Sequence, residues 1–124
     1  MALHILVVDD DVDVLPVLVE ILQVSGHMVT AADSGLAMRD VLAGKLAVDA
    51  IVLDWTMPGE PTAQLALHAR ALKIPVVMIS GSDEAMQFAD ENGLQLLAKP
   101  FKMAELLTAL DGAVASGEFG QRDA

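Results

Sequence analysis

The stretch Ile-Leu-Val-Val-Asp-Asp at residues 5–10 runs four aliphatic residues directly into two acids. Such an apolar run, ending abruptly in polar residues, is typical of a buried strand whose carboxyl end reaches the surface. Two later stretches have the same form: Ala-Ile-Val-Leu at 50–53 precedes Asp54, and Val-Val-Met-Ile at 76–79 precedes Ser80. Because continuously apolar strands are those covered on both faces, these three predict the centre of a parallel sheet.

Short apolar runs alternate along the chain with longer segments whose apolar residues recur every three or four positions. Two further strands are expected at 28–31 and 95–98, and the longer segments predict amphipathic helices. The expected helices cover residues 14–24, 34–43, 62–72, 84–92 and 103–115. We therefore expect an α/β fold, a doubly wound five-stranded parallel sheet with helices on both faces.

Capping residues mark where several of these helices begin or end. Asp13 is expected to cap the first helix, which places Pro16 in the first turn, where a missing N–H costs little. Ser34 and Asp83 are the expected N-caps of the second and fourth helices. Gly93 is expected to end the fourth helix, because glycine readily adopts the left-handed conformation found there.

The length of 124 residues and the 54% hydrophobic content suit one compact domain. We expect this domain to span residues 1–116, followed by a flexible polar tail at 117–124. The longest apolar runs fall far short of the ~20 residues that cross a membrane, and the first strand starts too early to leave room for a signal peptide. A soluble, cytoplasmic protein without membrane insertion is expected.

Charge and cysteine content exclude several functional classes. Seven Lys and Arg against 18 Asp and Glu give a formal charge of −11, which would repel nucleic acid phosphates, so no nucleic-acid partner is expected. The absence of cysteine excludes disulfides, thiolate metal sites and cysteine nucleophiles. His4, His27 and His68 lie at strand starts or on a helix, where structural or surface roles are expected.

Polar residues follow four of the expected strands, at the edge where a doubly wound sheet binds ligands. They are Asp9 and Asp10, Asp54, Ser80 and Lys99. Placing Asp9, Asp10 and Asp54 at neighbouring strand ends would crowd like charges unless a cation neutralises them. Mg²⁺ prefers carboxylate, water and phosphate oxygens, and Mn²⁺ would fit as well. Taken alone, the acids could also merely solvate a loop and cap a helix.

Asp54 ends a buried run, where a carboxylate can act as a nucleophile and form an aspartyl phosphate. Phosphoryl transfer depends mainly on positioning and on neutralising the transferred oxygens, which a metal ion and Lys99 could do together. Ser80 could donate a hydrogen bond to a phosphoryl oxygen, and Gly81 would let the backbone approach closely. The set predicts phosphoryl transfer to Asp54.

In this order and at these strand ends, the residues resemble a response regulator receiver domain over about residues 3–115. The resemblance rests on residues 5–10, Asp54 with Met57 and Pro58, Ser80 with Gly81, and Lys-Pro-Phe at 99–101. It implies a flavodoxin-like fold, as in a chemotaxis receiver, with strand order 2-1-3-4-5. Asp54 would be the phosphoacceptor, assisted by Ser80 and Lys99. The implied magnesium ligands are Asp10, Asp54 and the backbone carbonyl of Thr56, with Asp9 assisting through water.

By the same resemblance, the chain would be a stand-alone receiver of a two-component system or phosphorelay. It would accept a phosphoryl group from a histidine kinase or histidine phosphotransfer protein and signal to a downstream protein by conformational change or phosphoryl shuttling. It would catalyse only its own phosphorylation and dephosphorylation, and so would not be an enzyme acting on other substrates. Donor docking is expected at the first helix, through Val14, Leu15 and Leu18.

Three features decide how such a receiver would behave. Leu96 stands three residues before Lys99, where many receivers have a Tyr or Phe that turns inward on activation, so phosphoryl shuttling or a rearranged fourth helix is expected instead. Residues 59–62 read Gly-Glu-Pro-Thr, where the family commonly has, after Met-Pro, a residue, then an acid or similar polar group and a glycine. Thr56 and Ser82, on the expected path of hydrolytic water, are neutral, which predicts no unusually fast self-dephosphorylation.

Other functions fit the sequence less well. A receiver-like docking module that is not phosphorylated is the main alternative, favoured by Leu96 and the altered loop at 59–62. Residues 54–56 faintly resemble the nucleophile loop of haloacid-dehalogenase-type phosphatases, but Thr56 stands where that family needs a second aspartate. A nucleotide-binding fold is disfavoured because acids, not glycines, follow the first strand. Trp55 is expected to be a partly exposed ring beside the site.

Overall fold

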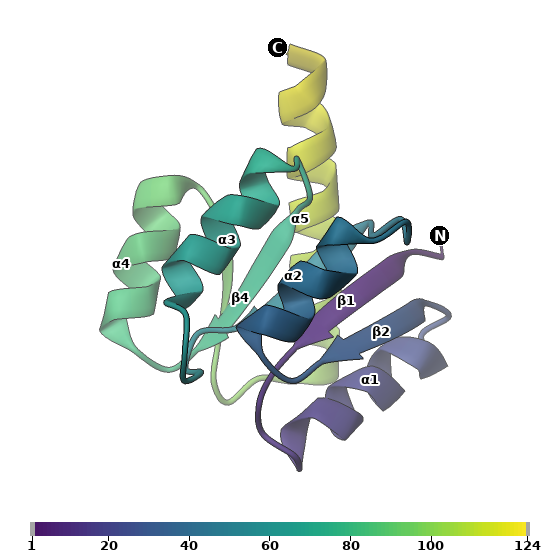
Figure 1. Cartoon of the computed structure of the whole chain (residues 1–124). Helices are drawn as coiled ribbons and strands as arrows, with labels where there is room; N and C mark the ends of the chain where they lie inside the picture. Colours follow the sequence, from purple (N-terminus) through teal and green to yellow (C-terminus); the bar gives the residue numbers. More distant parts are fainter. Residues whose placement is uncertain (1, 124) are drawn as a thin grey trace.

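The computed structural model describes the backbone of residues 2–123 and the side chains of residues 2–115. Strands and helices alternate along the chain (Figure 1). The strands are β1 (His4–Val8), β2 (Met28–Ala32), β3 (Ala50–Asp54), β4 (Val76–Ser80) and β5 (Gln95–Ala98). The helices are α1 (Val14–Val24), α2 (Gly35–Ala43), α3 (Thr62–Ala71), α4 (Asp83–Asn92) and α5 (Met103–Asp123). Every expected strand and helix is confirmed.

All five strands are parallel and follow the order β2-β1-β3-β4-β5, which confirms the expected fold. β1, β3 and β4 are therefore central, and β2 and β5 form the edges. The strand order reverses at β1, because the chain runs outward from β1 to β2 and then returns to β3 on the other side. Such a switch point opens the carboxyl edge between β1 and β3 to a ligand.

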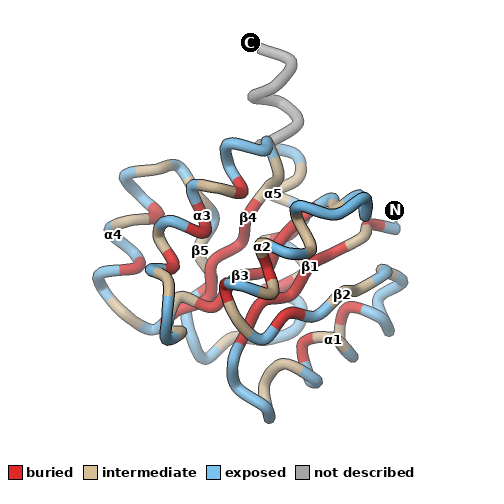
Figure 2. The backbone as a smooth tube through the Cα atoms, viewed as in Figure 1, coloured by how far each residue is buried: buried red, intermediate tan, exposed pale blue. Residues whose placement is uncertain are grey.

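Two apolar layers cover the two faces of the sheet, because successive side chains of a strand point to opposite faces. On one face the strands pack against α1 and α5, and the largest buried residues there are Ile5, Ile79, Leu22, Leu106 and Leu110. On the other face they pack against α2, α3 and α4, and the largest are Leu6, Ile51, Leu53, Met38, Leu65 and Met78. Figure 2 shows burial concentrated along the central strands. This packing holds the strand ends in fixed positions.

The start of α1 differs from the expectation in its capping residue. Asp13 occupies the N-cap position, but its side chain makes no capping hydrogen bond. Asp11 Oδ1 instead accepts hydrogen bonds from the backbone N–H groups of Asp13 at 2.8 Å and Val14 at 3.2 Å. An aspartate two or three residues upstream folds back readily onto such free amides, which explains the difference. Pro16 lies in the first turn, as expected.

Ser82, rather than the expected Asp83, caps α4. The Ser82 hydroxyl accepts a hydrogen bond from the N–H of Ala85 at 3.1 Å, and Asp83 becomes the first helical residue. Ser82 has the extended backbone that an N-cap needs, while the negative charge of Asp83 is favourable within the first turn. The expected cap of α2 by Ser34 is confirmed, and so is the end of α4 at Gly93, whose φ is 65°.

The apolar surface of α1 also differs from the expected one. Leu18 is buried in the core, with 3% of its surface exposed, while Val14 and Leu15 are partly buried. Only Leu18 contradicts the expected surface, and Val17 in the first turn and Val12 just before the helix are more exposed than Val14 and Leu15, at 53% and 83%. The helical period explains this, because positions four apart share a face and Leu18 falls on the face that contacts the sheet.

Two histidines hold the amino-terminal part of the sheet together, away from the carboxyl edge. His4 Nδ1 lies 2.8 Å from the carbonyl oxygen of Ala47, and His4 Nε2 lies 2.7 Å from Thr30 Oγ1. Because a carbonyl only accepts, Nδ1 carries the proton and Nε2 accepts from the Thr30 hydroxyl. His27 Nδ1 accepts a hydrogen bond from the N–H of Leu3 at 3.1 Å. These contacts fit the structural roles expected.

α5 extends to Asp123, beyond the expected helix end at residue 115. A flexible tail was predicted at 117–124. The side chains of these residues, and residue 124 as a whole, lie outside the described residues. The domain boundary at residue 116 therefore stays a prediction. In the part of the chain that the structure describes, no helix is both long enough and apolar enough to cross a membrane.

Candidate functional site

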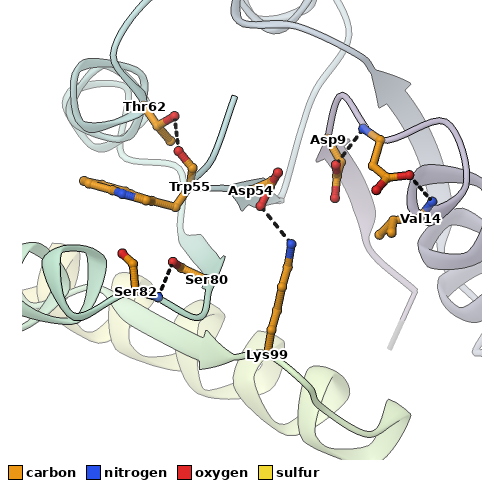
Figure 3. A network of polar contacts seen from close by, with 9 residues as sticks. Asp9, Val14, Asp54, Trp55, Thr62, Ser80, Ser82 and Lys99 are labelled. Carbon is orange, nitrogen blue, oxygen red and sulfur yellow. Dashed lines mark hydrogen bonds and ion pairs between the residues drawn. The ribbon is translucent and has the colours of Figure 1, made fainter. Parts of the chain in front are cut away.

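Four neighbouring strands bring polar residues to the carboxyl edge of the sheet (Figure 3). Asp54 is the last residue of β3 and Ser80 is the last residue of β4. Asp9 and Asp10 follow β1, and Lys99 follows β5. Because β1, β3, β4 and β5 are consecutive in the sheet, these residues lie along one edge although they come from distant parts of the sequence.

Three aspartates form a compact acidic cluster. Asp9, Asp10 and Asp54 each place one carboxylate oxygen so that the three oxygens lie within 4.8 Å of one another. Asp9 and Asp54 are buried, whereas Asp10 is exposed. Carboxylate oxygens are the protein ligands that Mg²⁺ and Mn²⁺ prefer, and an exposed side leaves room for water ligands. The cluster could therefore bind a divalent cation.

Asp9 shows why a cation suits this cluster. Its Oδ1 accepts a hydrogen bond from the N–H of Asp11 at 2.9 Å, but its buried Oδ2 has no hydrogen-bond partner among the described residues. Burial raises the pKa of the Asp9 carboxyl above its ordinary value, and the Asp54 carboxylate raises it further, against the lowering effect of the Asp11 N–H. An unpaired buried carboxylate oxygen is costly unless a cation or water satisfies it. The donor set thus fits the metal that the resemblance implies.

Lys99 Nζ lies 3.2 Å from Asp54 Oδ1 (Figure 3). The side chain of Asp54 is 5% exposed and that of Lys99 is 41% exposed. The Lys99 ammonium group therefore approaches the buried carboxylate from the solvent side. The backbone N–H of Lys99 also donates to the carbonyl oxygen of Ser80 at 3.1 Å, which ties the end of β5 to β4. Lys99 thereby places a positive charge beside a carboxylate that otherwise faces other acids.

Ser80 is buried, and its hydroxyl oxygen accepts a hydrogen bond from the N–H of Ser82 at 2.9 Å. The hydroxyl keeps its own proton to donate, because this bond uses only an oxygen lone pair. Asp54 pairs in register with Ile79, so Ser80 is one residue beyond the strand position opposite Asp54. Ser80 thus lies close to the edge that carries Asp54 and is tied to the residue that caps α4.

The backbone just after Asp54 is held on both sides. The N–H of Trp55 donates to the carbonyl oxygen of Ile79 at 2.9 Å, and the Thr62 hydroxyl donates to the carbonyl oxygen of Trp55 at 2.7 Å (Figure 3). Thr56 follows as an exposed residue in the loop that leads to α3. Its backbone carbonyl stays a predicted metal ligand.

An ion pair holds the far end of the same loop. Arg39 of α2 donates two hydrogen bonds to the Glu60 carboxylate, with its Nε 2.7 Å from Oε1. The Arg39 guanidinium holds the pKa of Glu60 below its ordinary value through this hydrogen bonding. Gly59, directly before Glu60, has a φ of 94°, a conformation that glycine adopts without strain. The loop therefore contacts α2 through the Arg39–Glu60 ion pair and α3 through the Thr62–Trp55 hydrogen bond.

Trp55 and Phe88 connect the site to α4. Their ring centroids lie 5.4 Å apart with the planes tilted by 42°. Trp55 is partly exposed beside Asp54, as expected, and Leu96 packs partly buried against the core on the α4 side. Neither Phe88 nor Thr62 was predicted as part of the site. The helical period does not mark Phe88 as a partner of Trp55, whereas Thr62 belongs to the stretch 59–62 that departs from the family pattern.

Comparison with known proteins places these residues in a family. The profile of the response regulator receiver domain matches residues 5–111 of the chain. Transcriptional regulatory protein PrrA of Mycobacterium tuberculosis is 37% identical over 110 residues, which cover 84% of this chain and 46% of that protein. Protein PetR of Rhodobacter capsulatus is 32% identical over 114 residues, which cover 87% and 47%. The chain thus spans about half the length of these curated relatives.

Solved structures agree with the sequence relatives. A response regulator receiver protein from Sinorhizobium medicae superposes with a TM-score of 0.81 and 29% identity, over 94% of this chain and 97% of that one. NtrX from Brucella abortus gives a TM-score of 0.85 and 28% identity, over 98% of this chain and 29% of that one. The matched range 5–111 contains all the strand-end residues of the site. This chain therefore belongs to the response regulator receiver domain family.

Proposed function

We propose that this receiver domain takes a phosphoryl group onto Asp54 from a histidine kinase or a histidine phosphotransfer protein. The strongest support is the 3.2 Å contact between Lys99 Nζ and Asp54 Oδ1, beside the acidic cluster that Asp54 forms with Asp9 and Asp10. It combines a buried nucleophile, a positive charge for the transferred oxygens and ligands for a metal ion. The domain catalyses only its own phosphorylation and dephosphorylation.

In the transfer, a carboxylate oxygen of Asp54 attacks the phosphorus atom of a phosphohistidine. The new O–P bond forms as the P–N bond breaks, and the imidazole nitrogen keeps the electron pair and takes up a proton. The Lys99 ammonium shifts from Asp54 Oδ1 to a phosphoryl oxygen, where a charge-assisted hydrogen bond is strong. The product is an acyl phosphate on Asp54.

The residues that would hold Mg²⁺ or Mn²⁺ are Asp10, Asp54 and the backbone carbonyl of Thr56, with Asp9 acting through water. When bound, the metal neutralises charge on the carboxylates and on the phosphoryl oxygens. The buried Asp9 Oδ2, which has no partner among the described residues, supports this assignment.

Phosphorylation is signalled through α4 or the phosphoryl group is passed on, and two contacts link the site to α4. The Ser80 hydroxyl, which now accepts from the N–H of Ser82, turns to donate to a phosphoryl oxygen. Rotation of the Ser80 side chain toward that oxygen moves its Oγ away from the Ser82 N–H, which removes a contact in the turn that leads into α4, whose cap is Ser82. The Trp55–Phe88 ring pair is a second link between the phosphorylated strand end and the same helix. Leu96 has no ring to turn inward, so the signal runs through α4 or the phosphoryl group is passed on.

Partners contact two different surfaces. The donor protein docks on two exposed valines next to the carboxyl edge, Val12 just before α1 and Val17 in its first turn. The downstream partner is a protein, since the charge of −11 disfavours nucleic acid contact by this domain. PrrA is named a transcriptional regulatory protein, and this chain corresponds to about half of it, so a partner in transcriptional regulation is in keeping with the comparison.

Intact mass measurement after incubation with Mg²⁺ and acetyl phosphate tests this function. We expect one phosphoryl adduct on the wild type and none on Asp54→Asn or in the presence of EDTA. Asp40→Asn, at an exposed aspartate of α2, is the matched control and should be labelled like the wild type. A wild type without adduct would favour the alternative, a docking module that works without phosphorylation.

A further inference from the structure

Thr62 stands out among the buried residues. Where the structure describes side chains, four polar residues are buried: Asp9, Asp54, Ser80 and Thr62. The first three belong to the strand ends of the site, whereas Thr62 is the first residue of α3. Thr62 is 5% exposed, and its hydroxyl donates to the carbonyl oxygen of Trp55 at 2.7 Å (Figure 3). A buried hydroxyl therefore contacts the residue next to the proposed phosphoacceptor.

Helix formation does not account for this hydroxyl. Pro61 holds the N-cap position of α3 without a side-chain capping bond, and its carbonyl accepts from the N–H of Gln64 at 3.0 Å. Threonine has a lower helix propensity than most residues, so α3 gains nothing from it at this position. The Thr62 hydroxyl therefore stabilises the loop after β3 rather than the start of α3.

The hydrogen bond fixes the peptide unit between Trp55 and Thr56. Both backbone polar groups of Trp55 are held, the N–H by the carbonyl of Ile79 in β4 and the carbonyl by Thr62 in α3. Because a peptide unit is planar, holding the Trp55 carbonyl also fixes the direction of the Thr56 N–H. Only the two backbone torsions of Thr56 then separate this fixed unit from the Thr56 carbonyl.

We propose that Thr62 is a positioning residue for metal binding, which sets the Thr56 carbonyl for a divalent cation without touching the ion. This role rests on the proposed function, in which that carbonyl is a metal ligand. Mg²⁺ demands near-ideal octahedral geometry, and a ligand on an unfixed loop adds an ordering cost to binding. Mutating a group that orients a metal ligand without touching the ion commonly lowers metal affinity by about 10- to 100-fold. The Arg39–Glu60 ion pair holds the other end of this loop.

Three variants separate positioning from a merely structural role. Thr62→Val removes the hydroxyl and keeps the shape of the side chain, and Thr62→Ser restores the hydroxyl. Thr30→Val is the matched control, because Thr30 Oγ1 also makes a 2.7 Å hydrogen bond, to His4 Nε2, away from the site. Each protein is titrated with Mg²⁺ alone while the fluorescence of Trp55, the single tryptophan, is followed. Amide hydrogen exchange at Thr56 is measured without metal.

We expect the Mg²⁺ dissociation constant of Thr62→Val to rise about tenfold, and those of Thr62→Ser and Thr30→Val to stay within about twofold of the wild type. Exchange at the Thr56 amide should be faster in Thr62→Val before any metal is added. Saturating Mg²⁺ should restore the rate at which acetyl phosphate labels Thr62→Val. If Thr62→Val does not fold, Thr62→Ala, which also lacks the hydroxyl, makes the same comparison.

Equal Mg²⁺ dissociation constants for Thr62→Val and Thr30→Val would overturn the positioning role and leave the Thr62 hydroxyl as a structural contact. Absence of a saturable Mg²⁺ response in the wild type would contradict metal binding itself, and the positioning role with it. The two failures are distinguishable, because the wild type still shows a saturable Mg²⁺ response in the first case and shows none in the second.

Discussion

Lys99 Nζ and Asp54 Oδ1 lie 3.2 Å apart although the two residues are separated by 45 positions in the sequence. The contact spans from the end of β5, past β4, to the end of β3. It exists because a parallel sheet places the carboxyl ends of its strands along one edge. The strand order therefore brings together site residues that lie far apart in the sequence.

Replacing Lys99 with methionine should slow phosphorylation of Asp54 by about 100-fold, because the transferred oxygens lose their positive partner. The variant should also be less stable in EDTA, because the buried Asp54 carboxylate loses its positive partner. Initial rates of adduct formation with acetyl phosphate and Mg²⁺ measure the effect. Lys102→Met, at an exposed lysine just before α5, is the control. Equal rates for the two variants would contradict the role of Lys99.

Replacing Asp9 with asparagine should stabilise the metal-free domain by about 1 kcal/mol, because a buried carboxylate is exchanged for a neutral amide. The Oδ1 acceptor for the Asp11 N–H is kept, and the unpaired Oδ2 is replaced by the neutral NH2 group of the amide. Urea unfolding in EDTA measures this gain, and Mg²⁺ titration should show weaker binding. If Asp9→Asn is less stable than the wild type in EDTA, burial of the Asp9 carboxylate does not destabilise the metal-free domain.

The gain in stability of Asp9→Asn over the wild type should depend on pH. The pKa of Asp9 is raised in the folded state, so the folded protein binds this proton more tightly than the unfolded chain does. Above the folded pKa the charged Asp9 lowers stability, and this penalty disappears as the pH falls through the folded pKa toward the ordinary value of 3.8. The stability difference between Asp9→Asn and the wild type should therefore shrink on acidification. A difference that grows instead would refute the assignment.

Replacing Phe88 with leucine should uncouple Trp55 from α4 while leaving phosphorylation intact. Phe88 provides the ring contact of Trp55 with α4, and leucine keeps apolar volume without the ring. In the wild type, beryllofluoride with Mg²⁺ should change both Trp55 fluorescence and the amide spectra of α4. The fluorescence change should fall by about half or more in Phe88→Leu but not in Met86→Leu, at an exposed position of the same helix.

Near-identical amide spectra of the wild type with and without beryllofluoride would rule out the rearrangement of α4. In that case phosphoryl shuttling would be the function left for a receiver with Leu96 before Lys99.

Placing a charge on α1 should impair donor docking but not the chemistry. Val17→Lys should slow phosphotransfer from a phosphorylated histidine phosphotransfer protein about tenfold, because an exposed apolar contact is replaced by a charge. Labelling by acetyl phosphate, which needs no docking surface, should be unchanged. Val24→Lys makes the same change at an exposed residue at the other end of α1. Equal slowing by both variants would reject a docking surface at the start of the helix.

The fold and the main site residues could be predicted because their signals are local. Four consecutive apolar residues before Asp54, and similar runs before Asp9 and Ser80, mark buried strands and the points where they end. Once the sheet is parallel, its topology brings these ends together without further information. The positions of Asp9, Asp54, Ser80 and Lys99 at one edge follow from the sequence for this reason.

Other features depend on choices that the sequence pattern does not resolve. Asp11 and Asp13 compete for the same free amides, and so do Ser82 and Asp83, with the outcome decided by backbone torsions at each helix start. The sequence does not say which face of α1 turns toward the sheet, so Leu18 was wrongly expected on the surface.

Contacts between separate elements were the least predictable. The Trp55–Phe88 ring pair and the Thr62–Trp55 hydrogen bond require the relative placement of the loop after β3, of α3 and of α4. Neither is implied by helical or strand periodicity.

Borohydride reduction tests most directly whether Asp54 carries the phosphoryl group, because it converts a phosphorylated aspartate into homoserine. The protein is labelled with acetyl phosphate and Mg²⁺, reduced, digested and sequenced by mass spectrometry. We predict homoserine at position 54 in the wild type and at no position in Asp54→Asn. Homoserine at Asp9 or Asp10, or none in a wild type that Mg²⁺ saturates, would contradict phosphorylation of Asp54.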